Sequence, residues 1–297
     1  MPTSPGTGSR LVFVSVKSFG DLLIAATSLT RISPSERNLP ALLIGEHLKP
    51  LVSVLSIPTE VRLLNERLDG PAPLFDARRH GAGAAAISAL SLRRSIGQAL
   101  APNEVLAFDT LGLRERFLAF GRTSVALPPA ENIYAAYEAL LHACGLPIAP
   151  VEPATLGPPK DGIVRIFAGA RMAHRRPPAA LLRRIVQRVE ARGRRAEVVL
   201  LEGERPDLEG EPFPHLVVPR DFGAMLDVVR DAAAVISPDS MTAHLAEYCG
   251  KPSLVLTPAE KFYWMPRFAA KNRTISLFND DLMTGPLDMF LTRYVAA

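Results

Sequence analysis

Cysteine is scarce in this chain, and its two thiols follow no pattern. Cys144 and Cys249 lie far apart, with no Cys-x-x-Cys pair and no Cys/His spacing around them. These spacings argue against a disulfide framework and a structural zinc site, so each cysteine is interpreted as a small residue in an apolar helix. No metal site is predicted.

Long apolar runs are also lacking. The first ten residues hold no hydrophobic segment of the kind that a secretory signal needs, and the apolar segment 11–32 is broken by Lys17 and Asp21. We therefore expect a cytoplasmic protein. This location is compatible with peripheral contact at the cytoplasmic face of the inner membrane.

Neither sign of charge dominates. The 34 Lys and Arg residues exceed the 30 Asp and Glu residues by a formal net charge of +4, and the excess is spread along the chain. This balance suits an anionic ligand or membrane surface, and equally an ordinary solvated surface. Arg184, Arg188 and Arg192 recur at helical spacing opposite an apolar face, which indicates a solvated helix and no nucleic-acid partner.

Several catalytic motifs are absent. The chain has no Gly-x-Ser-x-Gly, His-Glu-x-x-His or P-loop segment, so hydrolase, zinc-protease and P-loop interpretations lack support. The Gly-x-Gly at Gly6–Gly8 comes before the first predicted strand, whereas a dinucleotide-binding fingerprint would follow it.

The chain does contain short apolar runs that alternate with helical patterns, which predicts an α/β fold with parallel sheets. In the first half, strands are expected at 11–16, 41–45, 60–64, 104–110 and 123–127, and helices at 22–32, 84–101, 113–120 and 133–143.

A segment rich in proline and glycine, 145–162, is interpreted as a linker. The alternation then restarts, with strands expected within IVRIFAG, AEVVLLEG, HLVVP, AVIS and SLVLT before a polar tail. We therefore predict two Rossmann-like domains, 1–150 and 151–297, whose parallel sheets face an interdomain cleft. The tail is expected to pack back on the N-terminal domain.

One helix carries more polar residues at its start than packing requires. Asp239, Ser240, Thr242 and His244 crowd its first turn and a half. A capped helix explains one of them, because Asp239 or Ser240 can accept a bond from a first-turn N–H. The others favour a phosphate site, since a helix N-terminus offers free N–H groups and partial positive charge.

A second polar junction follows the first strand. Gly20 stands where the strand turns into a helix, and Asp21 opens that helix. Asp21 is interpreted either as the N-cap of the helix or as a general base that takes a proton from an attacking hydroxyl.

Basic side chains gather between a strand and a helix of the second half. Gly169 permits a close backbone approach, and the loop after it holds Arg171, His174, Arg175 and Arg176. Such a loop is either solvated or binds a diphosphate, because guanidinium groups match phosphate oxygens. Glu204 comes after the next strand. It is interpreted either as an acceptor of hydrogen bonds from a ribose or as an ordinary exposed glutamate.

Taken in order, these segments resemble glycosyltransferase family 9, the lipopolysaccharide heptosyltransferase family, whose members have the two-domain GT-B fold. Ser15–Asp21 is similar to the family's Ser-x-x-Gly-Asp-type turn, His174–Pro177 to its Lys-x-Trp-Pro segment, and Gly203-Glu204 to its Gly-x-x-x-Glu-like stretch. The most specific likeness is that of Asp239–His244, with the trailing Gly250-Lys251-Pro252, to Asp-[Ser/Thr]-Gly-Pro-x-His and Gly-Lys-Pro.

The resemblance implies an inverting, metal-independent glycosyltransferase that needs no cofactor. Its donor substrate would be a nucleotide-diphosphate sugar, by default an ADP-sugar that carries heptose. Its acceptor would be a hydroxyl of a cell-envelope glycan, or of another glycan or glycolipid. Asp21 would be the base, Glu204 would hold the ribose, and Asp239 and His244 would shape the phosphate pocket. The helix start at Ser240–Thr242 and the basic loop 171–176 would stabilise the leaving diphosphate.

Two alternatives stay open. Met241 stands where the family has glycine and His174 where it has lysine, which suits a non-catalytic family-9-like protein that binds a nucleotide or scaffolds a partner. Another GT-B enzyme, such as a nucleotide-sugar epimerase, would carry the same donor site without using an acceptor.

Overall fold

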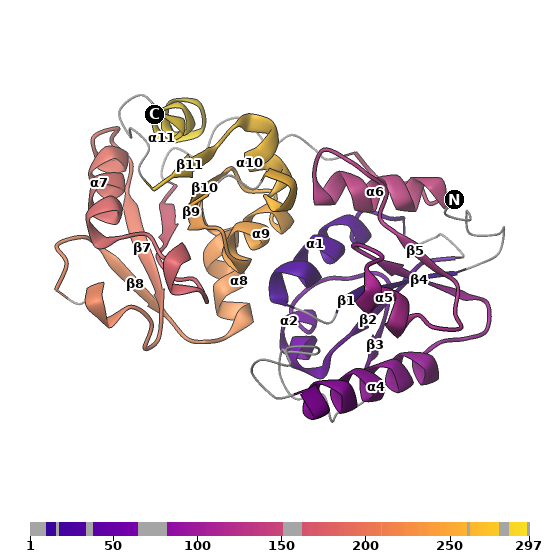
Figure 1. Cartoon of the computed structure of the whole chain (residues 1–297). Coiled ribbons are helices and arrows are strands. Elements are labelled where there is room, and N and C mark those ends of the chain that lie inside the picture. Colours follow the sequence, from indigo (N-terminus) through magenta and orange to yellow (C-terminus); the bar gives the residue numbers. More distant parts are fainter. Residues whose placement is uncertain are drawn as a thin grey trace. The chain divides into compact units, whose positions relative to one another are not determined.

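The computed structural model describes residues 10–15, 18–33, 38–64, 82–150, 162–208, 210–259, 262–278 and 285–295. The chain forms two compact units, Met1–Pro150 and Val151–Ala297, each built around its own parallel sheet (Figure 1). The α/β class expected from the alternation is confirmed.

The N-terminal sheet has the strand order β3-β2-β1-β4-β5, with parallel neighbours throughout. Its strands are β1 (Arg10–Ser15), β2 (Ala41–Ile44), β3 (Glu60–Leu63), β4 (Glu104–Phe108) and β5 (Ser124–Ala126). Strands β2 and β4 are buried along their whole length, as expected of parallel strands covered on both faces. The apolar runs locate all of these strands, with ends that differ by one or two residues.

Helices cover both faces of this sheet. They are α1 (Phe19–Leu29), η1 (Glu46–Leu48), α2 (Lys49–Val52), α4 (Ala82–Ala99), α5 (Leu113–Leu118) and α6 (Ile133–Ala143). α1 and α6 pack together on one face, and α4 lies on the other (Figure 1). Alternating side chains of β1 serve both layers: Phe13 contacts Tyr137 of α6 with ring centroids 5.2 Å apart, and Val12 shares a core with Leu92 of α4.

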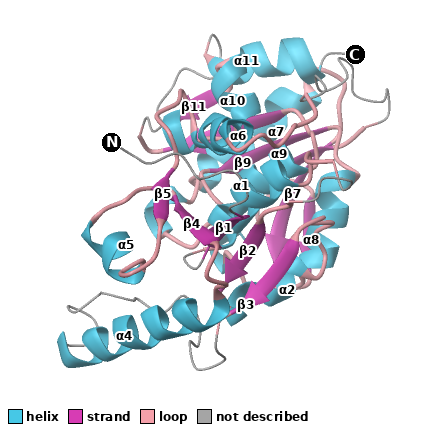
Figure 2. Cartoon of the chain, turned by 90° about the vertical axis from the view of Figure 1, so that its right-hand side faces the viewer, coloured by secondary structure: helices cyan, strands magenta, loops and turns pink. Residues whose placement is uncertain are grey.

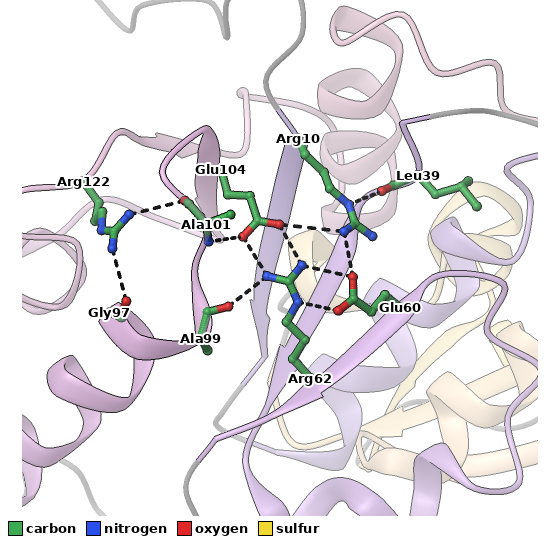
Figure 3. Close-up of polar contacts among 9 residues, drawn as sticks. All are labelled: Arg10, Leu39, Glu60, Arg62, Gly97, Ala99, Ala101, Glu104 and Arg122. Carbon is green, nitrogen blue, oxygen red and sulfur yellow. Dashed lines mark hydrogen bonds and ion pairs between the residues drawn. The ribbon is translucent and has the colours of Figure 1, made fainter.

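A network of ion pairs joins the amino ends of β1, β3 and β4 (Figure 3). Arg62 donates two hydrogen bonds to the buried Glu104, of 2.7 and 2.8 Å, and Arg10 donates to Glu60 at 2.7 Å. Hydrogen bonds from Arg62 and then Arg10 lower the pKa of Glu60 to about 2. Because ligands of such sheets bind at the carboxyl ends of the strands, we interpret this network as structural.

The first part of the predicted linker belongs to the N-terminal unit. Ile148 forms an antiparallel bridge with Ile32, and the Ala149 N–H donates to the Arg31 carbonyl at 2.9 Å. Residues 151–161 of the predicted linker lie outside the described residues.

The C-terminal sheet has the strand order β11-β10-β9-β6-β7-β8, again with parallel neighbours. Its strands are β6 (Val164–Phe167), β7 (Ala196–Leu201), β8 (His215–Val218), β9 (Ala234–Pro238), β10 (Ser253–Thr257) and β11 (Ile275–Leu277). The first five match the apolar runs that follow the linker. β11 falls in the segment expected to be a polar tail, because three residues are too short a pattern to indicate a strand.

The helices of this domain are α7 (Ala179–Glu190), α8 (Phe222–Arg230), α9 (Met241–Tyr248), α10 (Arg267–Asn272) and α11 (Pro286–Phe290), with the short turns η2 (Ala173–Arg175), η3 (Pro206–Leu208), η4 (Phe262–Trp264) and η5 (Leu291–Val295). α7 buries Ile185 and Val189 and turns Arg184 outward, as the pattern predicts. Arg192 differs from that pattern because it forms an ion pair with Asp288 of α11. No helix among the described residues combines the length and apolarity that a membrane span requires.

The C-terminal tail packs on the domain to which it belongs. Leu287, Phe290 and Tyr294 are buried in the same core as β6, β7 and β9, and the Arg194 Nε donates to the Val295 carbonyl at 2.8 Å. Its apolar side chains therefore complete the hydrophobic layer over the C-terminal sheet. The expected contact of the tail with the N-terminal domain stays a prediction.

Candidate functional site

Three loops follow neighbouring strands of the C-terminal sheet. β9, β6 and β7 are adjacent in the strand order, and the segments after them hold all the site residues expected in this domain. Since the carboxyl ends of parallel strands lie on one side of the sheet, this carboxyl edge brings together the basic loop after β6, Glu204 after β7 and the start of α9 after β9. This edge is the candidate donor site.

The start of α9 is not capped by a side chain. Ser240 occupies the N-cap position in an extended conformation, but no side chain accepts a hydrogen bond there. Its Oγ lies instead 2.8 Å from the Oγ1 of Thr242, which lies 2.5 Å from the Oγ of Ser237. The expectation that Asp239 or Ser240 caps the helix is therefore wrong. The three hydroxyls bond to one another. The first two amides of α9 therefore have no side-chain cap and, with the helix dipole, can face an anion, while the Ala243 N–H donates to the Ser240 carbonyl at 3.2 Å.

Two further residues of α9 set the polarity of this site. His244, one turn into the helix, is 7% exposed, and burial lowers its pKa from 6.5 to about 4. The imidazole is therefore neutral at pH 7, so it can supply an N–H donor but no positive charge. Met241, at the first helical position, is partly exposed.

The basic loop after β6 is divided between structural and exposed side chains. Arg175 contacts Asp239 at 3.1 Å and also donates to its carbonyl at 3.3 Å, so it ties this loop to the start of α9. Arg176 Nε donates to the Ala170 carbonyl at 2.8 Å within its own loop. Arg171, His174 and Arg176 are exposed. The loop therefore presents these three side chains outward, while Arg175 is partly neutralised by a carboxylate.

Glu204 lies against the backbone at Gly169. A Cβ added to Gly169 would overlap the Glu204 carboxylate, so the close approach expected at this glycine is that of a side chain from the neighbouring loop. The Leu201 N–H donates to Glu204 Oε2 at 3.2 Å. Glu204 is thus held at the sheet edge beside β6, and it remains partly exposed.

Arg205 holds these loops together and was not expected from the sequence. Its side chain is buried, and Nη1 donates to the carbonyls of Ala168 and Pro177, each at 3.0 Å. Nη2 pairs with Asp207 at 2.8 Å. Arg205 also has a positive φ of 55°, a conformation that non-glycine residues adopt rarely. An arginine beside Pro-Asp resembles any surface loop, so only the tertiary contacts identify its role.

The junction after β1 has a different construction. Ser18 is the N-cap of α1, and its Oγ accepts the Asp21 N–H at 3.4 Å. Asp21 is therefore not the cap but a partly exposed residue of the first helical turn, where the helix dipole stabilises a carboxylate. Gly20 lies inside the helix rather than at the sharp turn expected of it. Residues 16 and 17 lie outside the described residues.

The comparisons with known proteins agree with this architecture. No protein-family model matches the sequence, and no curated protein matches it. Among solved structures, the chain is similar to a glycosyl transferase family 9 protein from Veillonella parvula, with a TM-score of 0.60, 14% identity, and coverage of 93% of this chain and 87% of that one.

Two heptosyltransferases of E. coli are also similar. For WaaC with ADP-2-deoxy-2-fluoro heptose, the TM-score is 0.59 at 13% identity, over 90% of this chain and 92% of that chain. For ADP-heptose lps heptosyltransferase II, it is 0.53 at 11% identity, over 95% and 99%. The resemblance that the motifs indicate is thus confirmed in three dimensions: the chain has the GT-B fold, with two Rossmann-like domains.

Proposed function

We propose that this protein is a glycosyltransferase that moves a sugar from a nucleoside diphosphate to an acceptor hydroxyl. The observation that carries the proposal is the edge of the C-terminal sheet, where the uncapped α9 start, the hydroxyls of Ser240 and Thr242, and the exposed Arg171 follow adjacent strands. Free amides, hydroxyls and a guanidinium are the groups that bind phosphate oxygens.

The donor in this proposal is an ADP-sugar, with heptose as the first candidate. Its diphosphate binds at the start of α9 and at Arg171 and His174, and its ribose hydroxyls donate hydrogen bonds to Glu204. Two of the similar structures support this choice: WaaC with ADP-2-deoxy-2-fluoro heptose, and ADP-heptose lps heptosyltransferase II. The acceptor is a hydroxyl of a cell-envelope glycan or glycolipid, reached at the cytoplasmic face of the inner membrane.

The proposed reaction is a single displacement that inverts the anomeric centre. Asp21 takes the proton of the acceptor hydroxyl while that oxygen forms a bond to the anomeric carbon. The bond from this carbon to the diphosphate breaks, and its electrons pass to the leaving phosphate oxygen. The α9 amides and Arg171 stabilise the charge that develops there. The proposal assigns no metal ion and no cofactor to these steps.

A panel of nucleoside diphosphates and their sugar conjugates tests the donor site first. We expect one diphosphate to raise the melting temperature selectively, and Arg171→Ala to weaken its binding. The matched control is Arg184→Ala, an exposed arginine on α7, which should bind like the wild type. If no member of the panel binds, the proposed site is wrong.

Release of the diphosphate from the bound sugar nucleotide then tests the transfer. We expect release that depends on an added glycan or glycolipid acceptor, together with an acceptor product of inverted configuration. An altered sugar nucleotide formed without acceptor would assign the protein to the epimerases instead. Tight nucleotide binding with no turnover for any pair would favour the non-catalytic alternative, which the Arg175–Asp239 pair and Met241 motivate.

A further inference from the structure

One face of the N-terminal domain exposes large apolar side chains. Ile87 and Leu90 on α4 are 71% and 55% exposed, and Phe120, just after α5, is 71% exposed. Ile87, Leu90 and Arg94 follow one another at helical i, i+3 and i+7 spacing, so they form a single stripe on α4. α4 runs along the outer side of this domain, with α5 beside it (Figure 2). We call this surface, formed by α4 and Phe120–Arg122, the α4 face.

A cavity of about 360 Å³ opens on the α4 face. Leu90 and Phe120 line it together with three arginines: Arg93, Arg94 and Arg122. The Arg93 guanidinium lies 4.5 Å from the centre of the Phe120 ring, close enough for a cation–π contact. Arg122 donates to the Gly97 and Ala101 carbonyls at 3.1 and 3.3 Å, which fixes it at the cavity wall. Apolar surface and positive charge therefore share one hollow.

The charge on the described part of this face has one sign. α4 contains no acidic residue, and Glu115 of α5 is only 8% exposed. None of the residues that line the cavity is acidic. The face therefore complements an anionic partner that also offers an apolar phase.

We propose that the α4 face docks on the surface of a bilayer that contains anionic lipid. Ile87, Leu90 and Phe120 enter the region between headgroups and acyl chains, while Arg93 and Arg94 contact lipid phosphates. A small soluble anion would use the arginines but would leave the exposed apolar side chains in water, so a bilayer fits the surface better.

This surface lies apart from the Asp21 junction. α4 covers one face of the N-terminal sheet, whereas α1, whose first turn holds Asp21, packs with α6 on the other face (Figure 1). The inference therefore concerns a different part of the domain, and it does not rest on the proposed transferase activity.

Co-sedimentation of the full chain with vesicles tests the proposal directly. We expect binding to vesicles made of equal parts phosphatidylcholine and phosphatidylglycerol, much weaker binding to phosphatidylcholine alone, and a decrease with added salt. Equal binding to both kinds of vesicle, or binding to neither, would overturn the proposal.

Variants of exposed residues locate the contact. Arg94→Glu should lower the partition coefficient by about tenfold or more, and Leu90→Ser combined with Phe120→Ser should lower it further. The matched controls are Arg184→Glu on α7 and Val217→Ser on β8, which is 60% exposed. Melting curves verify that each variant is folded. The proposal is wrong if the α4-face variants bind like the wild type, or if the controls lose as much binding.

A second copy of the chain is the competing occupant. The molar mass of the lipid-free protein decides this point by sedimentation equilibrium. We expect a mass that Phe120→Ser leaves unchanged. A dimer that this substitution dissociates would show that the α4 face is a subunit interface, and it would overturn the membrane assignment.

Discussion

α1 and α9 each follow a buried parallel strand, and their first turns are built in opposite ways. In α1 the side chain of Ser18 accepts the Asp21 N–H, so the helix end is closed and carries a carboxylate. In α9 Ser240 occupies the same position, but its hydroxyl bonds to Thr242 and leaves the helix end without a side-chain cap.

The two helix starts look alike in the sequence, because each has a serine before the first turn. Their structures nevertheless suit different chemistry, namely proton acceptance and phosphate binding. A closed end that holds an acid can accept a proton but repels a phosphate. An open end that holds neutral hydroxyls attracts a phosphate and offers it donors. The two junctions therefore suit the acceptor and the donor of the proposed transfer, respectively.

Removal of the Asp21 charge is the strongest test of this division. We expect Asp21→Asn to lower kcat by about 10²–10⁴-fold, the range for loss of a general base, with the dissociation constant of the nucleoside diphosphate unchanged. Steady-state kinetics and calorimetric titration measure the two quantities. Glu131→Gln, at an exposed carboxylate of the same domain, is the control. Turnover close to the wild-type rate would remove Asp21 from the role of base.

The buried His244 distinguishes α9 from α1 by its pH dependence. Its pKa is about 4 in the folded chain, against 6.5 when unperturbed, so the unfolded chain binds the proton more readily. The stabilisation that the neutral, buried imidazole provides is therefore complete above pH 6.5 and is lost as the pH falls toward 4. This loss lowers the free energy of unfolding by about 3 kcal/mol.

Denaturant titrations between pH 7 and 4 measure this effect, with His244→Asn as the comparison. The variant should lose less stability than the wild type over that interval. The lowered pKa of Glu60 contributes mainly below pH 4.5, where the unfolded carboxylate is protonated and the folded one stays charged until about pH 2, and it contributes equally in both proteins. Parallel profiles for the two proteins would show that His244 is not held neutral by burial.

A side-chain cap at the start of α9 should stabilise the fold and weaken diphosphate binding. Ser240→Asp places a carboxylate cap on α9, which we expect to raise the free energy of unfolding by up to about 1 kcal/mol. The same charge should weaken diphosphate binding by about tenfold or more, through repulsion. Ser240→Asn separates the two effects, since it can cap the helix without a charge. Unchanged diphosphate affinity in Ser240→Asp would exclude the α9 start from the donor site.

The smallest expected effect concerns the two serines themselves. Ser18→Ala removes a side-chain cap and should lower the free energy of unfolding by about 1 kcal/mol. Ser240→Ala removes no cap and should lower it less. Thermal and denaturant unfolding of the pair measure the difference. Equal losses would mean that the two helix ends are not distinct in solution.

The fold could be predicted from the sequence because its signals are local. Apolar runs such as 41–44 and 104–108 are buried on both faces and identify themselves without knowledge of their neighbours. The strand-to-helix junction of the candidate donor site was equally local, since Asp239–His244 follow a strand and begin a helix. The short β11 and the packing of the tail depend on which surface remains uncovered, and no local pattern contains that information.

The inner connections of the site could not be predicted for a related reason. Arg205 bonds to Ala168 and Pro177, which are distant in the sequence, and Arg175 bonds to Asp239. As isolated residues, both arginines have the appearance of solvated loop charges. The Ser18 cap, by contrast, could have been recognised in advance, because Ser18 and Asp21 stand at the spacing of a capping box.

Gly169 has a consequence for the interpretation of mutational scans. The group that a Cβ would displace is the end of a flexible glutamate side chain, not the backbone. A substitution at Gly169 should therefore leave the protein abundant and folded while it dislodges Glu204 from the sheet edge. In a screen that scores activity and expression separately, Gly169 would appear as a sensitive position although it carries no functional group, and a substitution there should add little to the loss that Glu204→Ala already causes.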